Sequence, residues 1–559
     1  AFMIRGMLHT RASRDAWLFW ILALLVLGAG LGLRAPWPAD EPRFALVAKH
    51  MVDSGDWLFP HRGGELYPDK PPLFMWLQAV AYMVFGNWRV AFLLPSLLAA
   101  LGALWLVVDL GKRMWTRRVG LYAGYALLFA LQFTYQAKRA QIDPLVTFWI
   151  TLGNYALLRF FLAPAGDDRA RWGFWMLGWF AAGLGTITKG VGAIVLLMLV
   201  PAIWASLRGW PGMRAPLASW KTLLGPLAFV AAAALWLVPM VTAALNHPDP
   251  AYHAYLDNIL FKQTAQRYAQ SWDHPQPPWY HLQVMATVWL PAMLALPWAI
   301  PAWRRRLQRR DARYLLPIAW WLLAVLFFSI PSGKRDVYIL PALPMACLAL
   351  APLLPGILRR VAAQRLALGF TLLLSLVLLA AGAGMLLGEP RFEQKLVLER
   401  GIAAPLLQGG AWMLAGIGCW GLGCALWFGR ARAAAGVVAT LAGVWVIYGL
   451  VGYPLLNDSS SARGLMRDAG ARIGPGARIG LVAWREQNLL MADRDATTFG
   501  FTKPPLEQMR LGIAWQREAP SRRWLLVQEP AMLPCVDRGR DCRAPSRTGR
   551  PDDGSSVRA

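Results

Sequence analysis

Residues 17–33, WLFWILALLVLGAGLGL, contain no charged side chain. A helix of about 20 predominantly apolar residues spans a bilayer, so this run predicts a transmembrane helix. Comparable, nearly uncharged blocks recur at Leu93–Leu110, Phe229–Leu245 and Leu366–Leu387. About thirteen such blocks lie between Trp17 and Val451 when they are judged by length and flanks. The sequence therefore predicts an all-α polytopic membrane protein.

The composition agrees with this class. Of 559 residues, 57% are hydrophobic and 16% are charged, whereas a soluble domain has about 45–50% apolar and about 25% charged residues. The net charge of +26 would suit a nucleic-acid partner, but its placement argues against one. Basic residues gather in every second connector, at 112–118, 169–171, 208–214, 304–313, 359–365 and 430–432. This positive-inside pattern predicts a bacterial inner-membrane protein with a cytoplasmic N-terminus and, after an odd number of spans, a periplasmic C-terminus.

The chain divides by composition into two predicted parts. Residues 1–452 form a transmembrane domain with long outer loops at about 34–87 and 246–280. In the first loop, Phe44, Val47, Ala48 and Met51 recur at helical spacing. They predict a helix over Pro42–Ser54 that lies at the membrane surface or packs on the bundle.

The second part, residues 453–559, is polar and rich in Arg. Its patterns predict a helix at Ser461–Ile473 and strands at Arg478–Trp484 and Trp524–Glu529. We therefore expect a small C-terminal α/β domain on the periplasmic side. The Ser-, Arg-, Asp- and Gly-rich end from Ala544 is expected to be disordered.

Cysteines and histidines in polar segments give two further expectations. Cys535 and Cys542 lie in the tail, and a periplasmic tail favours a local disulfide between them. His247, His253 and His274 lie in or beside the second loop near carboxylates, but no pair has the spacing of a zinc site. They are weak metal candidates, and we expect that no metal or cofactor is required.

The first loop carries the strongest chemical signal, the adjacent carboxylates Asp40 and Glu41. Charges beside a membrane are costly and are usually functional. The alternative is a solvated pair at the start of the predicted helix, with Asp40 as its N-cap. The same loop carries Tyr67 and Lys70. Lys70 either meets a phosphate group or only extends its amine to the membrane surface.

Later blocks add charges that the predicted topology places on the same outer face of the membrane as the first loop. Asp143 opens a span before Pro144, either in a site or as a helix N-cap. Lys189 lies in a largely apolar run, where a charge is usually paired or functional. Arg267 lies in the second loop, and the segment 332–341, SGKRDVYILP, includes Lys334 and Tyr338. Such cations suit a lipid phosphate, and the sequence contains no Walker-type loop for a nucleotide.

These stretches together resemble the GT-C superfamily of polytopic glycosyltransferases. The resemblance is carried by Asp40-Glu41-Pro42-Arg43, Lys70 to Leu73, Thr188-Lys189-Gly190, Arg267-Tyr268 with His274 to Tyr280, and Lys334 to Pro341. Their order is similar to that of polyprenyl-phosphate-sugar transferases, a group that includes protein mannosyltransferases. More specifically, the chain resembles the undecaprenyl phosphate–aminoarabinose:lipid A transferases.

The resemblance implies roles for individual residues. Asp40 would be the catalytic carboxylate. The carrier phosphate would be held by Tyr67, Lys70 and Arg267, with Lys189 as a further candidate. The residues that would line the same cavity are Glu41, Arg43, Asp143, Lys334 and Tyr338.

The implied reaction transfers 4-amino-4-deoxy-L-arabinose from undecaprenyl phosphate to a lipid A phosphate, a lipopolysaccharide modification that gives resistance to cationic peptides. We expect single displacement with inversion, because the sequence offers no evident second nucleophile. One alternative is another acceptor, as in a protein O-mannosyltransferase. The other is a lipid transporter or flippase. Transporters tend to place charges at the bilayer midplane and often contain repeats, whereas these charges gather at the predicted outer edge and no repeat is found.

Overall fold

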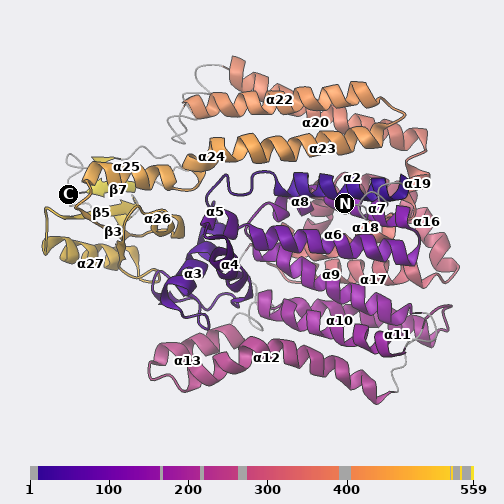
Figure 1. Ribbon diagram of the computed structural model, residues 1–559, viewed down its shortest axis with the longest axis horizontal. Coiled ribbons are helices and arrows are strands. Elements are labelled where there is room, and N and C mark those ends of the chain that lie inside the picture. The colour runs from indigo at the N-terminus through magenta and orange to yellow at the C-terminus, as the bar shows by residue number, and fades with distance from the viewer. Residues whose placement is uncertain are drawn as a thin grey trace, which may run out of the picture.

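The computed structural model describes residues 11–163, 168–213, 219–261, 274–388, 404–528, 531–532, 542–543 and 555–558. Long helices dominate the first 460 residues and lie roughly parallel to one another (Figure 1). These helices are α2 (Arg11–Gly28), α6 (Leu94–Met114), α9 (Ile142–Phe161), α10 (Asp168–Lys189), α12 (Leu224–Leu245), α17 (Ala312–Ser329), α20 (Val361–Leu387), α22 (Ala404–Phe428) and α23 (Ala433–Ile447).

Six described helical segments are long and apolar enough to cross a membrane. A seventh span results if the bent pair Tyr280–Val288 and Ala292–Gln308, which meet at 96°, is counted as one. The predicted helical membrane protein is therefore confirmed, whereas the count of about thirteen spans stays a prediction. Helices α2, α9 and α10 are also of spanning length, at 18, 20 and 22 residues, but they carry charged residues near their ends.

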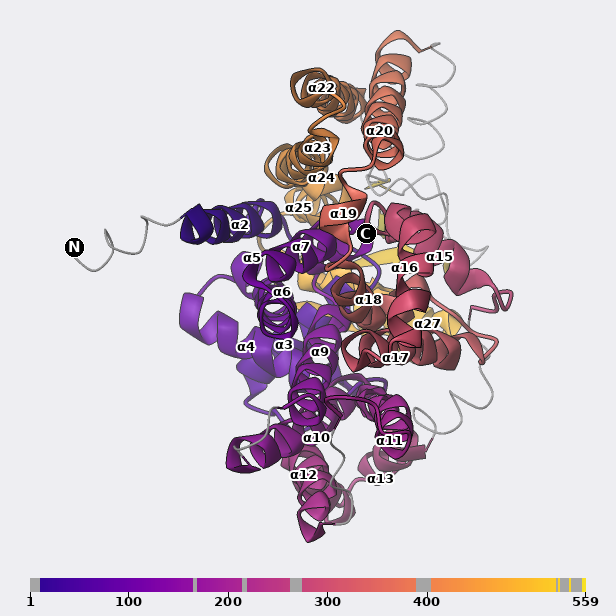
Figure 2. The same cartoon turned by 90° about the vertical axis from the view of Figure 1, so that its right-hand side faces the viewer.

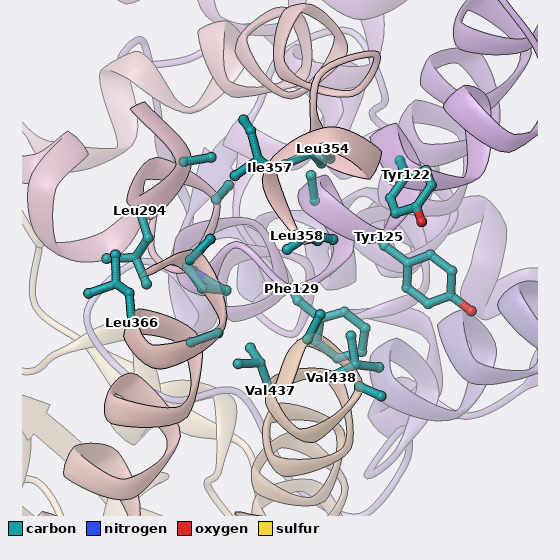
Figure 3. Close-up of a pocket in the computed structure, with 18 of the residues that line it drawn as sticks. Tyr122, Tyr125, Phe129, Leu294, Leu354, Ile357, Leu358, Leu366, Val437 and Val438 are labelled. Atoms are coloured by element: carbon teal, nitrogen blue, oxygen red, sulfur yellow. The ribbon is translucent and has the colours of Figure 1, made fainter. Parts of the chain in front are cut away.

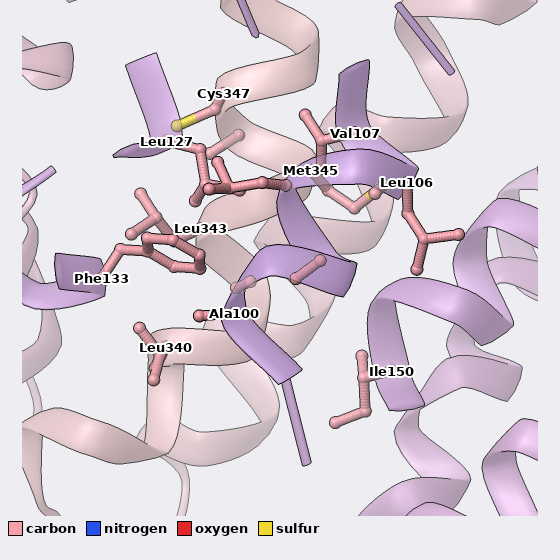
Figure 4. Packing of buried hydrophobic residues seen from close by; sticks show 14 of the residues in the cluster. Ala100, Leu106, Val107, Leu127, Phe133, Ile150, Leu340, Leu343, Met345 and Cys347 are labelled. Atoms are coloured by element: carbon pink, nitrogen blue, oxygen red, sulfur yellow. The ribbon is translucent and has the colours of Figure 1, made fainter. Parts of the chain in front are cut away.

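Shorter helices complete the bundle. They are α7 (Arg117–Leu128), α8 (Leu131–Ala137), η1 (Gly192–Met198), α11 (Leu199–Leu207), η2 (Trp220–Leu223), α15 (Tyr280–Val288), η4 (Ala292–Ala295), α16 (Leu296–Gln308), η5 (Asp336–Ala342), α18 (Leu343–Leu350) and α19 (Leu354–Ile357). Helix α18 is buried along its whole length. In Figure 4 its Leu343, Met345 and Cys347 pack beside Val107 of α6 and Leu127 of α7.

Small residues bring helices of the bundle close together. A Cβ placed on Gly120 of α7 would lie 2.3 Å from the Val108 carbonyl oxygen of α6. A Cβ on Gly183 of α10 would lie 2.6 Å from the Phe229 carbonyl oxygen of α12. Such close backbone approach is typical of membrane helix pairs, where apolar surface alone gives little drive for association. Helices α20, α22 and α23 form a separate layer beside α2 (Figures 1 and 2).

The first long connector is structured. It contains α3 (Glu41–Ser54), the antiparallel hairpin β1 (His61–Arg62) and β2 (Glu65–Leu66), α4 (Leu73–Phe85) and α5 (Trp88–Ala91). The predicted helix is confirmed, and its apolar residues Phe44, Val47, Ala48 and Met51 are buried. Of the two placements considered, α3 packs against the protein, because Phe44 meets Phe74 of α4 edge to face at 5.6 Å. In the second connector, α13 (Pro250–Asp257) packs its Tyr255 against Phe59.

Beyond α24 (Tyr453–Ser460) the described residues form α25 (Arg463–Ile473), β3 (Arg478–Val482), α26 (Glu486–Leu490), β4 (Ala496–Thr498), α27 (Pro505–Arg517) and β5 (Arg523–Gln528). The helix and both strands lie within two residues of the predicted bounds. Strand β3 pairs in parallel with β4 and β5. Strand β7 (Ser555–Arg558) pairs antiparallel with β5 and with β6 (Cys542–Arg543), although disorder was expected from Ala544. Leu46 of α3 joins the core of this C-terminal unit, so the unit docks on the first connector.

Candidate functional site

Asp40 lies at the start of α3, where the chain enters the first connector. It occupies the N-cap position, but its side chain accepts no capping hydrogen bond. Instead the carboxylate lies between two guanidinium groups. Arg43 approaches one oxygen at 3.8 Å and Arg335 the other at 3.6 Å. The side chain is 21% exposed, so a partly accessible anion is positioned between two cations.

Glu41 is placed differently from its neighbour. Its carboxylate is fully buried and accepts hydrogen bonds from the Arg34 guanidinium at 2.7 Å, the Trp37 N–H at 2.8 Å and the Ala140 N–H at 2.9 Å. Burial opposes ionisation, but Arg34 outweighs it and lowers the pKa of Glu41. The alternative of a solvated pair is therefore wrong, because Glu41 is buried. That Glu41 belongs to the substrate cavity stays a prediction. The two carboxylates have separate surroundings because α3 begins between them.

Arg43 connects Asp40 to the C-terminal unit. Its Nε donates to Glu486 at the start of α26, at 2.8 Å. Arg62 of the β1–β2 hairpin approaches the same Glu486 oxygen at 3.5 Å, and its guanidinium lies 3.6 Å from the Phe501 ring centre. Glu486 is buried. One carboxylate of the C-terminal unit therefore holds two arginines of the first connector.

Tyr67 lies beside Arg43 and Arg62. Its side chain is buried, with Arg62 lying 5.1 Å over its ring. Burial raises the pKa of Tyr67, while the nearby Arg43 opposes the rise. The phenol is thus kept protonated as a hydrogen-bond donor. Lys70, in the same loop, is half-buried and has interactions of its own.

A second ion pair lies at the ends of α9 and α10. The Lys189 ammonium donates to Asp143, and it lies 5.2 Å from the Tyr338 ring centre. Asp143 lies in the first turn of α9, and the N-cap residue of that helix is Gln141. The interpretation of Asp143 as the N-cap is therefore wrong. Tyr338 belongs to η5, and Arg335 immediately precedes that helix. This one segment therefore connects the Lys189 pair with Asp40.

Lys334 is a buried cation. It is 3% exposed, and its ammonium donates to the carbonyl oxygens of Gln276 at 3.0 Å and Ser332 at 3.4 Å. Its backbone N–H donates to the His274 carbonyl oxygen. Lys334 therefore attaches the end of the second connector to the segment that carries Arg335, and its place in the cavity stays a prediction.

The three candidate histidines have separate contacts. His247 stacks on Tyr252 at 3.6 Å, and the His253 ring lies 3.4 Å from the Leu245 carbonyl oxygen. His274 has a left-handed backbone, with φ of 55°. Within the described ranges, no group of three or more His, Cys, Asp or Glu residues could hold a metal ion. That the protein requires no metal stays a prediction.

Some predicted residues lie outside the described part of the chain. Arg267 and Cys535 are among them, and Cys542 is described only as part of β6. The phosphate role of Arg267 and the Cys535–Cys542 disulfide therefore stay predictions.

Sequence reasoning missed four charged residues of the site. Arg335 was noted beside Lys334 but was not selected. Arg62 and Glu486 carried no local signal, because their meeting depends on the docking of the C-terminal unit. Arg139, 3.9 Å from Glu41, lies in the connector before α9.

Comparison with known proteins gives concordant results. Residues 69–241 match the family described as dolichyl-phosphate-mannose-protein mannosyltransferase. An undecaprenyl phosphate-alpha-4-amino-4-deoxy-L-arabinose arabinosyl transferase of Pseudomonas aeruginosa (strain UCBPP-PA14) is 30% identical over 436 residues, which are 73% of this chain and 72% of the relative. One of the same name from Erwinia tasmaniensis is 31% identical, and the match covers 60% of this chain and 59% of the relative's length.

Among solved structures, ArnT from Cupriavidus metallidurans bound to undecaprenyl phosphate is similar over 97% of each chain. The TM-score is 0.73 and the sequence identity 18%. The likeness in fold extends through the bundle and the C-terminal unit together.

Proposed function

Since the chain belongs to the family of undecaprenyl phosphate-alpha-4-amino-4-deoxy-L-arabinose arabinosyl transferases, we propose that it transfers this aminoarabinose from undecaprenyl phosphate to a lipid A phosphate. The membership agrees with the GT-C resemblance. The observation that carries the proposal is Asp40, partly exposed and flanked by Arg43 and Arg335. An anion between two cations suits a substrate that carries both an ammonium and a phosphate.

The site lies on the periplasmic face in this proposal. The basic connectors support that orientation, because two of them meet at the end remote from Asp40: Arg313 donates to the Met114 carbonyl oxygen at 3.2 Å. The N-terminus is then cytoplasmic, and about thirteen spans place the C-terminal α/β unit in the periplasm. Docking of that unit on α3 supports the same side for both.

The carrier phosphate is held by Tyr67, Lys70 and Arg267, with Arg43 and Arg335 beside it. The bond between the sugar and the phosphate breaks, and negative charge grows on the leaving phosphate. Fixed donors stabilise this charge without reorganising, and loss of one such donor typically costs about 2.7–4 kcal/mol of barrier. The protonated Tyr67 phenol is suited to donate a hydrogen bond to the same group.

Asp40 orients the sugar in this mechanism. A lipid A phosphate is already ionised near neutral pH, so the attacking oxygen needs no general base. The Asp40 carboxylate instead attracts the ammonium of the aminosugar and places its anomeric carbon in line between the two phosphates. Attack and departure on opposite faces give inversion.

A second acceptor class has one observation in its favour, the match of residues 69–241 to protein mannosyltransferases. A protein hydroxyl, unlike a phosphate, must lose its proton during attack, and Asp40 would then act as the general base.

Mass spectrometry of lipid A separates the two acceptors. Cells that express the chain under inducing conditions should contain lipid A with added aminoarabinose, and cells without the gene should not. Unmodified lipid A together with newly glycosylated periplasmic protein would instead establish the second acceptor.

A further inference from the structure

An apolar cavity of about 590 Å³ lies between the main bundle and the layer of α20, α22 and α23 (Figure 3). Its walls come from α2, α7, η4, α16, α19, α20, the end of α22 and α23. Labelled side chains that line it are Tyr125, Phe129, Leu294, Leu358, Leu366 and Val438. It is remote from Asp40: α16 and α19 lie at the right of Figure 1, and α3 lies at the left.

The size and lining of this cavity fit a hydrocarbon chain. Pockets that hold small molecules usually have volumes of roughly 300–1,000 Å³. Water is a poor occupant, because it needs several polar partners. Among the lining side chains only Tyr122, Tyr125 and Trp298 carry a polar atom. Helices α20 and α23 belong to membrane-length segments. Lipid therefore has direct access to the space between them and the bundle.

Arginines flank the cavity where the chain leaves and re-enters its wall. Leu358 and Ala363 line the cavity, and the exposed Arg359 and Arg360 lie between them in sequence. Phe428 and Ala434 line it as well. Between this second pair lie the exposed Arg430 and Arg432, and the Arg432 guanidinium is 5.6 Å from the Phe428 ring centre. Two chain turns that border the lining therefore carry four exposed cations.

Two other arginines on the same side have carboxylate partners. Arg113 and Arg313 are paired with Asp109 and Asp311. No ion pair within the described part of the chain uses Arg359, Arg360, Arg430 or Arg432. Asp15 acts electrostatically on Tyr125 of the lining. The two turns that border the cavity therefore carry positive charge without a paired carboxylate among the described residues, and basic pockets between membrane helices bind anionic lipid head groups.

We propose that this cavity binds an anionic diacyl phospholipid. One acyl chain fills the apolar space, and the phosphate lies against Arg359, Arg360, Arg430 and Arg432. The carrier is a less suitable occupant, because its phosphate belongs beside Asp40 at the other end of the bundle. The bound lipid joins α20 and α23 to α7 and α16, which the cavity otherwise separates.

Native mass spectrometry of the full chain, released from nanodiscs, tests the charge requirement. The nanodiscs contain equal amounts of phosphatidylglycerol and phosphatidylcholine. Wild type should retain phosphatidylglycerol preferentially. The variant Arg359→Gln/Arg360→Gln should lose at least two-thirds of that occupancy. The matched control Arg169→Gln/Arg208→Gln removes two exposed cations that do not border the cavity. It should keep the phosphatidylglycerol occupancy of wild type. Equal retention in the two variants, or no preference between the lipids, would overturn the proposal.

A second measurement locates the lipid and does not depend on the charge variants. Phosphatidylglycerol with a photoreactive group in its acyl chain should label peptides of α7, α20 and α23. Ala367→Phe, which fills the cavity from α20, should reduce this labelling at least threefold. Ala362→Phe, an exposed position of the same helix outside the lining, should not. Labelling unaffected by Ala367→Phe, or abolished by added undecaprenyl phosphate, would contradict a phospholipid site. Neither experiment depends on sugar transfer.

Discussion

Glu41 supplies the buried anion that Arg34 requires. Arg34 is 1% exposed and donates to both carboxylate oxygens and to the Lys138 carbonyl oxygen. It also lies 4.8 Å over the Tyr453 ring. The pair therefore joins the end of the first span to α24 and to the connector before α9. A buried ion pair adds little over a well-packed apolar pair, but the removal of one partner leaves an uncompensated charge.

At the residue scale, we predict that Glu41→Ala destabilises the protein by about 3–5 kcal/mol, because it leaves the Arg34 guanidinium buried without its carboxylate. Thermal unfolding in detergent should show a clearly lower Tm. The control Glu507→Ala removes an exposed carboxylate that lies 3.4 Å from Lys503, and it should change stability by less than about 1 kcal/mol. Equal Tm values for the two variants would contradict the claim that Glu41 stabilises the fold by neutralising the buried Arg34.

The same pair gives a pH dependence. The pKa of Glu41 in the fold is below its ordinary value of 4.5. The pair therefore stabilises the fold above pH 4.5, and this stabilisation is lost as the pH falls through the lowered pKa. Glu41→Gln should flatten the acid side of the stability profile relative to wild type. If Glu41→Gln and wild type lose stability equally at low pH, other carboxylates control the acid dependence of stability.

Asp40 and Glu41 show how far sequence alone can resolve a site. The sequence identified the dipeptide and its loop, since two carboxylates beside a membrane are conspicuous. It could not assign them separate environments, because that depends on where α3 begins and on Arg34 and Arg335 coming from other segments. Lys334 and Arg335 were likewise adjacent, and their separation followed from the second connector closing over Lys334.

Helices α20, α22 and α23 pack through glycines. A Cβ on Gly382 of α20 would lie 2.5 Å from the Ala415 nitrogen and 2.7 Å from the Ala411 carbonyl oxygen of α22. The neighbouring Gly384, on the same helix, has no atom within 4 Å of such a Cβ. These two positions therefore separate the effect of close packing from the intrinsic helix propensity of glycine.

At the element scale, we predict that Gly382→Val lowers Tm by several degrees, because overpacking typically costs about 1–3 kcal/mol. Gly384→Val should leave Tm nearly unchanged. Fluorescence-detected size-exclusion chromatography after heating measures both variants in crude detergent extracts. A loss of Tm in Gly384→Val as large as in Gly382→Val would show that the α20–α22 contact is not the cause.

Regular elements with strong periodicity were predictable. The spacing of Phe44, Val47, Ala48 and Met51 gave α3, and β-branched and aliphatic runs gave β3 and β5. The number of membrane-spanning segments could not be predicted as directly as these elements. Apolar stretches such as Gly192–Leu207 and Asp336–Leu350 are divided between 3-10 and α-helical segments, and they are shorter than a standard span. Length rules alone do not decide whether such segments cross the bilayer.

The whole molecule brings its C-terminal unit to the site. Arg43 and Glu486 are 443 positions apart in sequence, so no local pattern could have joined them. Trp484 lies against Gly63 of the hairpin, where an added Cβ would be 2.4 Å from the indole ring. The C-terminal unit therefore fixes both Arg43 and the hairpin that carries Arg62.

At this scale, we predict that Glu486→Gln lowers the transfer rate by roughly tenfold. A hydrogen bond to a charged group contributes about 1.5–3 kcal/mol, and each 1.36 kcal/mol of barrier corresponds to about tenfold in rate. The loss should appear in kcat. Tm should fall less than in Glu41→Ala, because the glutamine retains the shape of the side chain and Arg43 and Arg62 are partly exposed. The control Glu518→Gln removes an exposed carboxylate of the same unit and should leave kcat unchanged. Equal kcat values in all three proteins would separate the C-terminal unit from catalysis.

The most direct test of the site is sugar transfer by purified protein in proteoliposomes. The vesicles contain undecaprenyl phosphate-linked aminoarabinose and lipid A, and modified lipid A is quantified by mass spectrometry. We expect Asp40→Asn to lower the transfer rate at least a hundredfold while it folds and binds undecaprenyl phosphate as wild type does. Asp53→Asn, an exposed position of the same helix α3, should transfer at the wild-type rate. Transfer by Asp40→Asn within a few-fold of wild type would contradict the central claim.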